Sequence, residues 1–163
     1  MNKRGFSGVI SAVIMIALVM AAVLIVWTVV NNLVTEKLDS SKSCLDVFDK
    51  VSLDQYYTCY DQSENEFRFG VKIEDVEVDY VLISISSEGD TQSYKLTNSS
   101  QTISGLSYLN GTTSVKMPGK NSGKTYVSTA FSSKPDIVSI IPVVNGNQCD
   151  AVDTLTSIGF CSS

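Results

Sequence analysis

Residues 5–35 read GFSGVISAVIMIALVMAAVLIVWTVVNNLVT, and this stretch contains no charged side chain. Within it, Val9 to Val30 is almost wholly aliphatic and is interrupted only by Ser11, Trp27 and Thr28. As a helix with a rise of about 1.5 Å per residue, these 22 positions are roughly 33 Å long, whereas the hydrocarbon core of a bilayer is about 30 Å thick. The stretch therefore predicts a membrane-length helix at the start of the chain.

Charge is distributed unequally around this apolar stretch. Lys3 and Arg4 are the only basic residues before Glu36, and no acidic residue precedes Glu36. Because positive charge favours the cytoplasmic side, we expect a cytoplasmic N-terminus and export of everything after Thr35. Since two of the 12 basic residues precede Glu36, the exported part has ten against 17 acidic residues, a net charge of −7. An acidic domain repels phosphate backbones, so no nucleic-acid partner is expected.

Four cysteines, Cys44, Cys59, Cys149 and Cys161, all lie in the part that we expect to be exported. In an oxidising compartment they predict two disulfides, for which three pairings are open. We favour the local pairing, Cys44 with Cys59 and Cys149 with Cys161, in which each loop contributes roughly 3 kcal/mol in the chain-entropy model. A zinc site is the alternative, but the chain has no histidine and lacks the close CxxC pairs of structural zinc sites.

Two tripeptides match the acceptor sequence for N-linked glycans, Asn98-Ser99-Ser100 and Asn110-Gly111-Thr112. Such sites occur on the surfaces of exported proteins. Asn98 and Asn110 are therefore candidate glycosylation sites.

Three kinds of segment combine a basic tip with a long apolar run: a secretory signal, a signal anchor and the leader of a filament subunit. A secretory signal has an apolar region of about 7 to 15 residues that ends in a small-x-small cleavage site. The run in this chain is longer and contains no A-x-A. The signal anchor stays open as the alternative to a leader.

The stretch MNKRGFSGVISAVIMIALVMAAVLIVW, residues 1–27, resembles the precursors of type IV pilins, in which a short basic leader ends in Gly directly before the hydrophobic helix. The resemblance implies cleavage by a prepilin peptidase between Gly5 and Phe6, which removes Lys3 and Arg4 within a leader of residues 1–5. It also implies that a helix over residues 6–41 stays in the mature protein, first in the membrane and then in the core of a filament.

One position departs from the bacterial pattern, because Ile10 stands where bacterial pilins usually have Glu. The archaeal branch commonly lacks this Glu and often begins with Ser-Pro-Val-Ile, which Ser7-Gly8-Val9-Ile10 approximates. The resemblance therefore favours an archaeal type IV pilin. It implies a helical homopolymer of this chain, with a prepilin peptidase, a pilus assembly ATPase and a membrane platform protein as partners.

Small residues interrupt the apolar helix at spacings near four, at Gly8, Ala12, Ala17 and Ala21. Small side chains let neighbouring helix backbones approach closely, so we expect these four positions to pack helix against helix. The alternative is a lipid-facing helix with an ordinary alanine content. No polar stripe divides the helix, so its surface suits lipid as well as a helix bundle.

Alternation of apolar and polar residues dominates the rest of the chain and predicts β-strands. Glu74-Asp75 separates two opposite registers of this alternation, which indicates a bulge or a turn. We expect an α+β protein in which a long hydrophobic N-terminal helix precedes an immunoglobulin-like all-β sandwich over residues 42–163, as the resemblance also implies. The predicted strands begin near Cys44 and include residues 67–73, 76–82, 93–96, 113–117, 125–131 and 137–144.

The sequence gives little support to an enzyme. Without histidine, the Ser-His-Asp and Cys-His arrangements cannot form, so we expect no catalysis and no cofactor. The acidic run 74–79 could hold a carboxylate pair. At strand spacing, however, Glu77 and Asp79 share one face, which indicates a solvated sheet surface.

Two loops match ligand-binding motifs only in part. Residues 61–65, DQSEN, begin like a calcium loop, but Glu66 and Lys72 stand where a Gly and the closing carboxylate are needed. Residues 119–125, GKNSGKT, end like a phosphate-binding P-loop, but Pro118 replaces the first Gly and a strand is expected to follow. We therefore expect two polar loops and no metal site.

The function that this sequence predicts is structural. We expect a subunit of a type IV pilus-like extracellular filament that serves adhesion or surface attachment, made as a single-pass membrane precursor. The alternative is an extracellular binding domain on a signal anchor that never polymerises.

Overall fold

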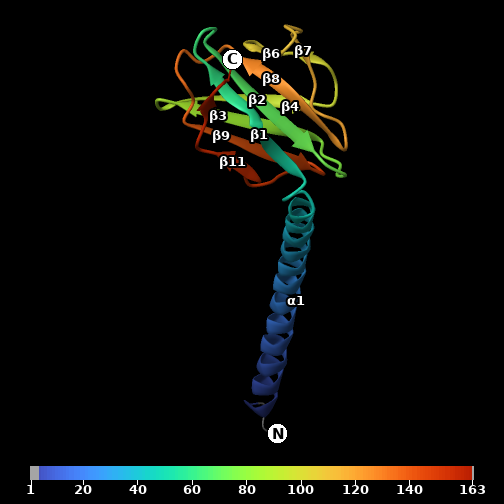
Figure 1. The fold of residues 1–163 in the computed structure, drawn as a ribbon. Helices are drawn as coiled ribbons and strands as arrows, with labels where there is room; N and C mark the ends of the chain where they lie inside the picture. Colours follow the sequence, from blue (N-terminus) through green and yellow to red (C-terminus); the bar gives the residue numbers. More distant parts are fainter. Residues whose placement is uncertain (1–3, 163) are drawn as a thin grey trace. The chain divides into compact units, whose positions relative to one another are not determined.

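The structure, a computed structural model, describes residues 4–162 of the chain (Figure 1). Its first element is a helix of 42 residues, α1 (Arg4–Leu45), and all the later elements are β-strands. The chain divides after Ser40 into two compact units. The first unit consists of α1 up to Ser40, and the second contains the last turn of α1 and every strand.

The helix is longer than its predicted range, and the prediction of a strand near Cys44 is wrong. The helical spacing of apolar residues prevails over the serine cluster before Cys44, so α1 ends at Leu45 and a turn follows. The Lys42 carbonyl accepts the Asp46 amide at 3.1 Å, and Val47 is fully buried in the core. Because this turn buries Val47, the first strand starts only at Val51.

One sheet of the second unit has five strands in the order β12-β1-β2-β8-β6. Its neighbours are antiparallel except for β1 and β12, which run parallel. The chain end therefore returns to lie beside the first strand. The bounds are β1 (Val51–Asp61), β2 (Glu66–Ile73), β6 (Leu106–Tyr108), β8 (Ser122–Ser128) and β12 (Gly159–Phe160).

A second sheet has the order β10-β9-β3-β4, and β11 also pairs with β9. All its pairings are antiparallel. The bounds are β3 (Tyr80–Ser87), β4 (Asp90–Thr97), β9 (Ile137–Val144), β10 (Asn147–Gln148) and β11 (Asp153–Leu155). Two short strands, β5 (Gln101–Thr102) and β7 (Ser114–Val115), form a separate pair.

The inward faces of the two sheets form one hydrophobic core. Every second residue of β3 is buried, and β2 follows the same alternation except that Gly70 is buried as well, so each strand gives one face to the core. Phe69 stacks on Tyr126 with 5.4 Å between ring centroids, and the Tyr94 hydroxyl reaches across to the Ser128 hydroxyl at 2.7 Å. This arrangement confirms the predicted α+β class with a sandwich head, the architecture of immunoglobulin-like domains.

The individual strand predictions vary in accuracy. The range 137–144 is confirmed in full as β9, and the turn at Glu74-Asp75 is confirmed as the end of β2, where the chain crosses to the other sheet. The strand predicted over 76–82 begins only at Tyr80, because Val76 and Val78 lie half-buried in that crossing segment. The ranges 113–117 and 125–131 overlap the shorter β7 and the earlier β8.

Candidate functional site

The apolar part of α1 is exposed along its whole length. Every residue from Ile10 to Thr35 is exposed, and this segment is long and apolar enough to cross a membrane. It carries 17 large apolar side chains whose exposed fractions range from 49% to 71%. A surface of this kind needs an apolar environment outside the chain.

Both threonine hydroxyls of this segment are satisfied within the helix. Thr28 donates to the Leu24 carbonyl at 2.7 Å, and Thr35 donates to the Asn31 carbonyl at 2.9 Å. A hydroxyl that enters an apolar environment without a partner costs about 2–7 kcal/mol. Because these two threonines have partners one turn earlier, they do not oppose transfer of the segment out of water.

The four predicted packing residues lie on two faces of the helix. At about 100° per residue, Gly8 and Ala12 share one face, and Ala17 and Ala21 share a face about 180° away. All four are exposed, and a Cβ added to Gly8 would meet no atom within 4 Å. The helix therefore offers close approach to neighbours on two opposite sides.

The predicted cleavage site falls in the first turn of α1. Gly5 and Phe6 both belong to the helix, which begins at Arg4, and Lys3 lies outside the described residues. The peptide bond between Gly5 and Phe6 thus lies about one helical turn before the exposed apolar segment, which begins at Ile10. Cleavage at this bond stays a prediction from the sequence.

The cysteines form two disulfides, but the local pairing that we favoured is wrong. Cys44 pairs with Cys149 across 105 residues, and Cys59 pairs with Cys161 across 102 residues. All four cysteines are thus disulfide-bonded, which leaves no thiolate for the zinc alternative. In the chain-entropy model each long loop contributes about 4.7 kcal/mol, more than the roughly 3 kcal/mol of a local loop. Disulfides of this kind indicate an oxidising, extracellular environment.

The strand order explains why the long pairing forms. Cys59 lies opposite Gly159 in the parallel pair of β1 and β12, and Cys161 directly follows β12, two residues after Gly159. Its amide donates to the Tyr60 carbonyl at 3.0 Å, and the Cα atoms of Cys59 and Cys161 lie 5.0 Å apart. A sequence pattern cannot reveal this pairing, because it depends on the return of the last strand to the first.

Both candidate glycosylation sites lie on exposed segments. Asn98 directly follows β4, and Asn110 lies in the loop after β6. The Asn110 side-chain oxygen accepts the Thr112 amide at 3.1 Å, which folds this tripeptide into a tight turn. Both asparagines are accessible to a modifying enzyme, and attachment of a glycan stays a prediction.

The calcium-like loop is a hairpin turn between β1 and β2. Asp61 accepts the Ser63 hydroxyl at 2.6 Å and the Ser63 amide at 3.0 Å, and it forms an ion pair with Arg68 at 2.8 Å. The Ser63 hydroxyl contributes most to holding the pKa of Asp61 below its usual value. The carboxylate therefore stabilises its own turn. Among the described residues no cluster of three or more His, Cys, Asp or Glu side chains could hold a metal ion.

The acidic run and the P-loop-like segment contact each other. Lys120 lies 3.2 Å from Glu77 and 3.7 Å from Asp75, and Asp79 accepts the Gly146 amide at 2.8 Å. Glu77 and Asp79 are exposed, as predicted, although they lie in the segment between the sheets rather than on a strand. The P-loop-like segment leads into β8, as predicted, and no helix follows it.

A large bulge in β1 is a feature that the sequence analysis missed. Asp54 lies opposite Gly70 and Cys59 opposite Arg68, so four residues, 55–58, stand opposite one. Thr58 donates to the Asp54 carbonyl at 2.7 Å and accepts the Gly70 amide at 3.3 Å, which closes the bulge. A change of parity in the buried positions, from Leu53 to Tyr60, is the sequence signal that could have revealed it.

Tyr56 and Tyr57 project from this bulge. Tyr56 is 87% exposed and Tyr57 is 55% exposed, and their rings meet edge to face with 5.2 Å between centroids. The Tyr56 amide donates to the Asp54 carboxylate at 3.0 Å, which fixes the start of the bulge.

A comparison of the chain with protein families, with curated proteins and with solved structures finds no match.

Proposed function

We propose that the chain is the structural subunit of a type IV pilus-like extracellular filament of the archaeal kind. In this proposal the precursor crosses the membrane once with its N-terminus in the cytoplasm. A prepilin peptidase cuts between Gly5 and Phe6, and an assembly ATPase and a platform protein move the helix from the membrane into a helical homopolymer. Adhesion or surface attachment is the role that we propose for the filament.

The observation that carries this proposal is the exposed, uncharged surface of α1 between Ile10 and Thr35. Covering one of the 17 large apolar side chains between Ile10 and Val34 stabilises the chain by about 1 kcal/mol, because only the 49% to 71% that is exposed remains to be covered. An apolar environment therefore stabilises the whole segment by about 15–20 kcal/mol relative to water, so we do not expect the segment to stay in water. Lipid supplies this cover in the precursor, and neighbouring helices supply it in a filament.

The two faces of small residues favour the filament over a lone anchor. A helix at the centre of a helical assembly has neighbours on more than one side. The pair Gly8 and Ala12 and the pair Ala17 and Ala21 provide two opposite faces for such contacts. A helix that only anchors a domain in lipid has no need of either face.

The β unit supports the exported half of the proposal. It has its own core and two disulfides that connect its beginning to its end, so it is suited to an oxidising surface. Head-to-tail contacts between such units give an open, helical assembly rather than a closed ring. These units would form the coat around the helical core.

Two measurements on the native protein test the proposal. Electron microscopy of the sheared surface fraction should show filaments that contain this chain, and mass spectrometry should find a mature N-terminus at Phe6. Intact Met1 in a protein that is confined to membranes as a monomer would instead support the signal-anchored binding domain. A mature N-terminus beyond Val30 would show that the apolar segment is a cleaved secretory signal and would refute both candidates.

A further inference from the structure

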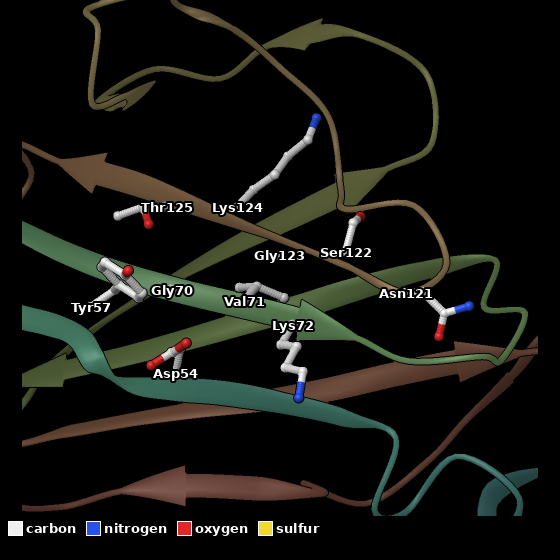
Figure 2. A pocket seen from close by; sticks show the side chains of 10 residues that line it. All are labelled: Asp54, Tyr57, Gly70, Val71, Lys72, Asn121, Ser122, Gly123, Lys124 and Thr125. Carbon is white, nitrogen blue, oxygen red and sulfur yellow. The ribbon is translucent and has the colours of Figure 1, made fainter.

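The outward face of the five-stranded sheet contains a groove of about 420 Å³ between β1, β2 and the start of β8 (Figure 2). We call it the outer groove, and ten residues line it: Asp54, Tyr57, Gly70, Val71, Lys72, Asn121, Ser122, Gly123, Lys124 and Thr125. Figure 2 shows Tyr57 and Asp54 beside the ribbon at Gly70, with Asn121 and Ser122 at the other end. The P-loop-like segment, which the proposed filament function does not use, thus lines this groove.

Two glycines form the floor of the outer groove, for different reasons. A Cβ at Gly70 would lie 2.8 Å from the Asp54 Cβ and 3.1 Å from the Tyr57 Cβ, so the bulge requires glycine there. A Cβ at Gly123 would meet only the Val71 carbonyl at 3.5 Å, an ordinary contact. Packing therefore does not require glycine at Gly123, and its absent side chain keeps the groove open.

A second hollow of about 530 Å³ adjoins the outer groove and shares Tyr57 and Thr125 with it. Tyr56 and Phe160 line this second hollow, and Phe160 is 62% exposed. Exposed aromatic rings therefore lie along both hollows, with Tyr57 between them. A ligand made of several linked units fits this arrangement better than a single small molecule.

The chemistry of the outer groove selects among ligand classes. Asp54 places a carboxylate at the rim. Of the two lysines that line the groove, Lys72 forms an ion pair with Glu74 at 3.2 Å and Lys124 donates to the Tyr108 hydroxyl at 3.0 Å, so a phosphate or another anion is disfavoured. An apolar protein surface would exclude water from the carboxylate, amide and hydroxyl groups of the rim, and each hydrogen bond lost in this way costs about 1–3 kcal/mol. The groove instead suits a neutral ligand that has many hydroxyl groups and an apolar face.

We propose that the outer groove and the adjoining hollow bind a neutral oligosaccharide. Sugar rings present C–H groups on their faces, which pack on aromatic rings, and hydroxyl groups at their edges, which donate and accept hydrogen bonds. Tyr57 packs against one sugar unit, and Asp54, Asn121 and Ser122 bind its hydroxyl groups. The next units extend across the second hollow toward Tyr56 and Phe160. Because both hollows belong to the β unit, this proposal does not depend on polymerisation.

The test uses the full chain in lauryldimethylamine oxide, a detergent that has no sugar headgroup to compete. The probes are immobilised maltohexaose, cellohexaose, mannohexaose and chitohexaose, and the same soluble hexaose serves as competitor. Wild-type protein should bind at least one probe. Tyr57→Ala removes the shared ring and Gly123→Val fills the groove with a side chain that the strand tolerates, so each should weaken binding about tenfold or more.

Tyr80→Ala is the matched control, because Tyr80 lies on the outward face of the other sheet under the Lys95 ammonium group. It should leave the affinity unchanged. Non-reducing peptide maps and thermal melts establish that each variant keeps the fold, and Gly123→Val alone decides the question if Tyr57→Ala unfolds the bulge. Wild-type binding to none of the probes overturns the proposal. Binding by both groove variants with the same affinity as the wild type also overturns the proposal. If no probe binds and the groove variants lose self-association, the outer groove is instead a contact between copies of the chain.

Discussion

Replacing Ala21 with aspartate should abolish filaments and leave the β unit folded. Ala21 lies in the middle of the exposed apolar segment, where no residue between Gly5 and Thr35 is charged and could pair with a carboxylate. An aspartate at the centre of a membrane helix costs about 2.5–3.5 kcal/mol on insertion scales. That cost lowers the equilibrium constant for burying one helix in an apolar environment about 60- to 300-fold, and the same cost applies to every subunit of a filament.

The assay compares the amount of the chain in the sheared surface fraction with the amount in membranes, by immunoblotting and electron microscopy. Ala151→Asp is the matched control, because Ala151 is an exposed residue of the β unit where an aspartate should change stability by less than about 0.5 kcal/mol. Ala21→Leu separates packing from insertion, since it keeps the helix apolar but enlarges a small-residue face. We expect it to stay in membranes and to give few filaments. Normal filaments from Ala21→Asp would refute burial of this helix in the filament core.

Two further predictions concern the β unit. Peptide mapping without reductant should recover the bonds Cys44–Cys149 and Cys59–Cys161, and local bonds in the map would contradict the strand order. Replacing both Cys59 and Cys161 with serine should lower the free energy of unfolding by about 2–5 kcal/mol, as measured in denaturant titrations. Burial raises the pKa of Tyr94 and Tyr126 above the usual value of about 10, so both retain their protons more strongly folded than unfolded. The contribution of these two protonated side chains to stability is complete below about pH 10 and is lost as the pH rises further. Two tyrosines should therefore ionise only when the protein unfolds, which tyrosinate absorbance and circular dichroism measure together. Ionisation of all tyrosines while the fold is still native would contradict this prediction.

The features that sequence alone predicts well are those that depend on neighbouring residues. The apolar run before Glu36 gives the helix directly, because it contains no charged residue and no proline and is too long for a strand. The alternation over 137–144 gives β9 in full, because each inward position of that strand enters the same core. The alternation at Val76 and Val78 is equally regular, but these residues pass between the sheets, and only the pairing partners of β3 determine where that strand begins.

The features that sequence alone misses depend on contacts between distant segments. The disulfide pairing follows from the parallel contact of β12 with β1, which has no local signal. The outer groove needs the bulge at Asp54 to lie against Gly70 and the loop before β8, and these three segments are far apart in the chain. The sequence reveals the polar residues of the P-loop-like segment, but it does not reveal that Asp54 and Tyr57 line the same groove.

The two long disulfides also limit how far the β unit can lengthen when it is pulled. An extended polypeptide spans about 3.4 Å per residue, so the 117 residue steps from Cys44 to Cys161 correspond to a contour length of about 400 Å. The bond between Cys44 and Cys149 bypasses 105 of these steps and leaves 12, about 40 Å. Tension between the end of the chain and the last turn of α1 therefore follows a covalent path about ten times shorter than the backbone, even after the strands have separated.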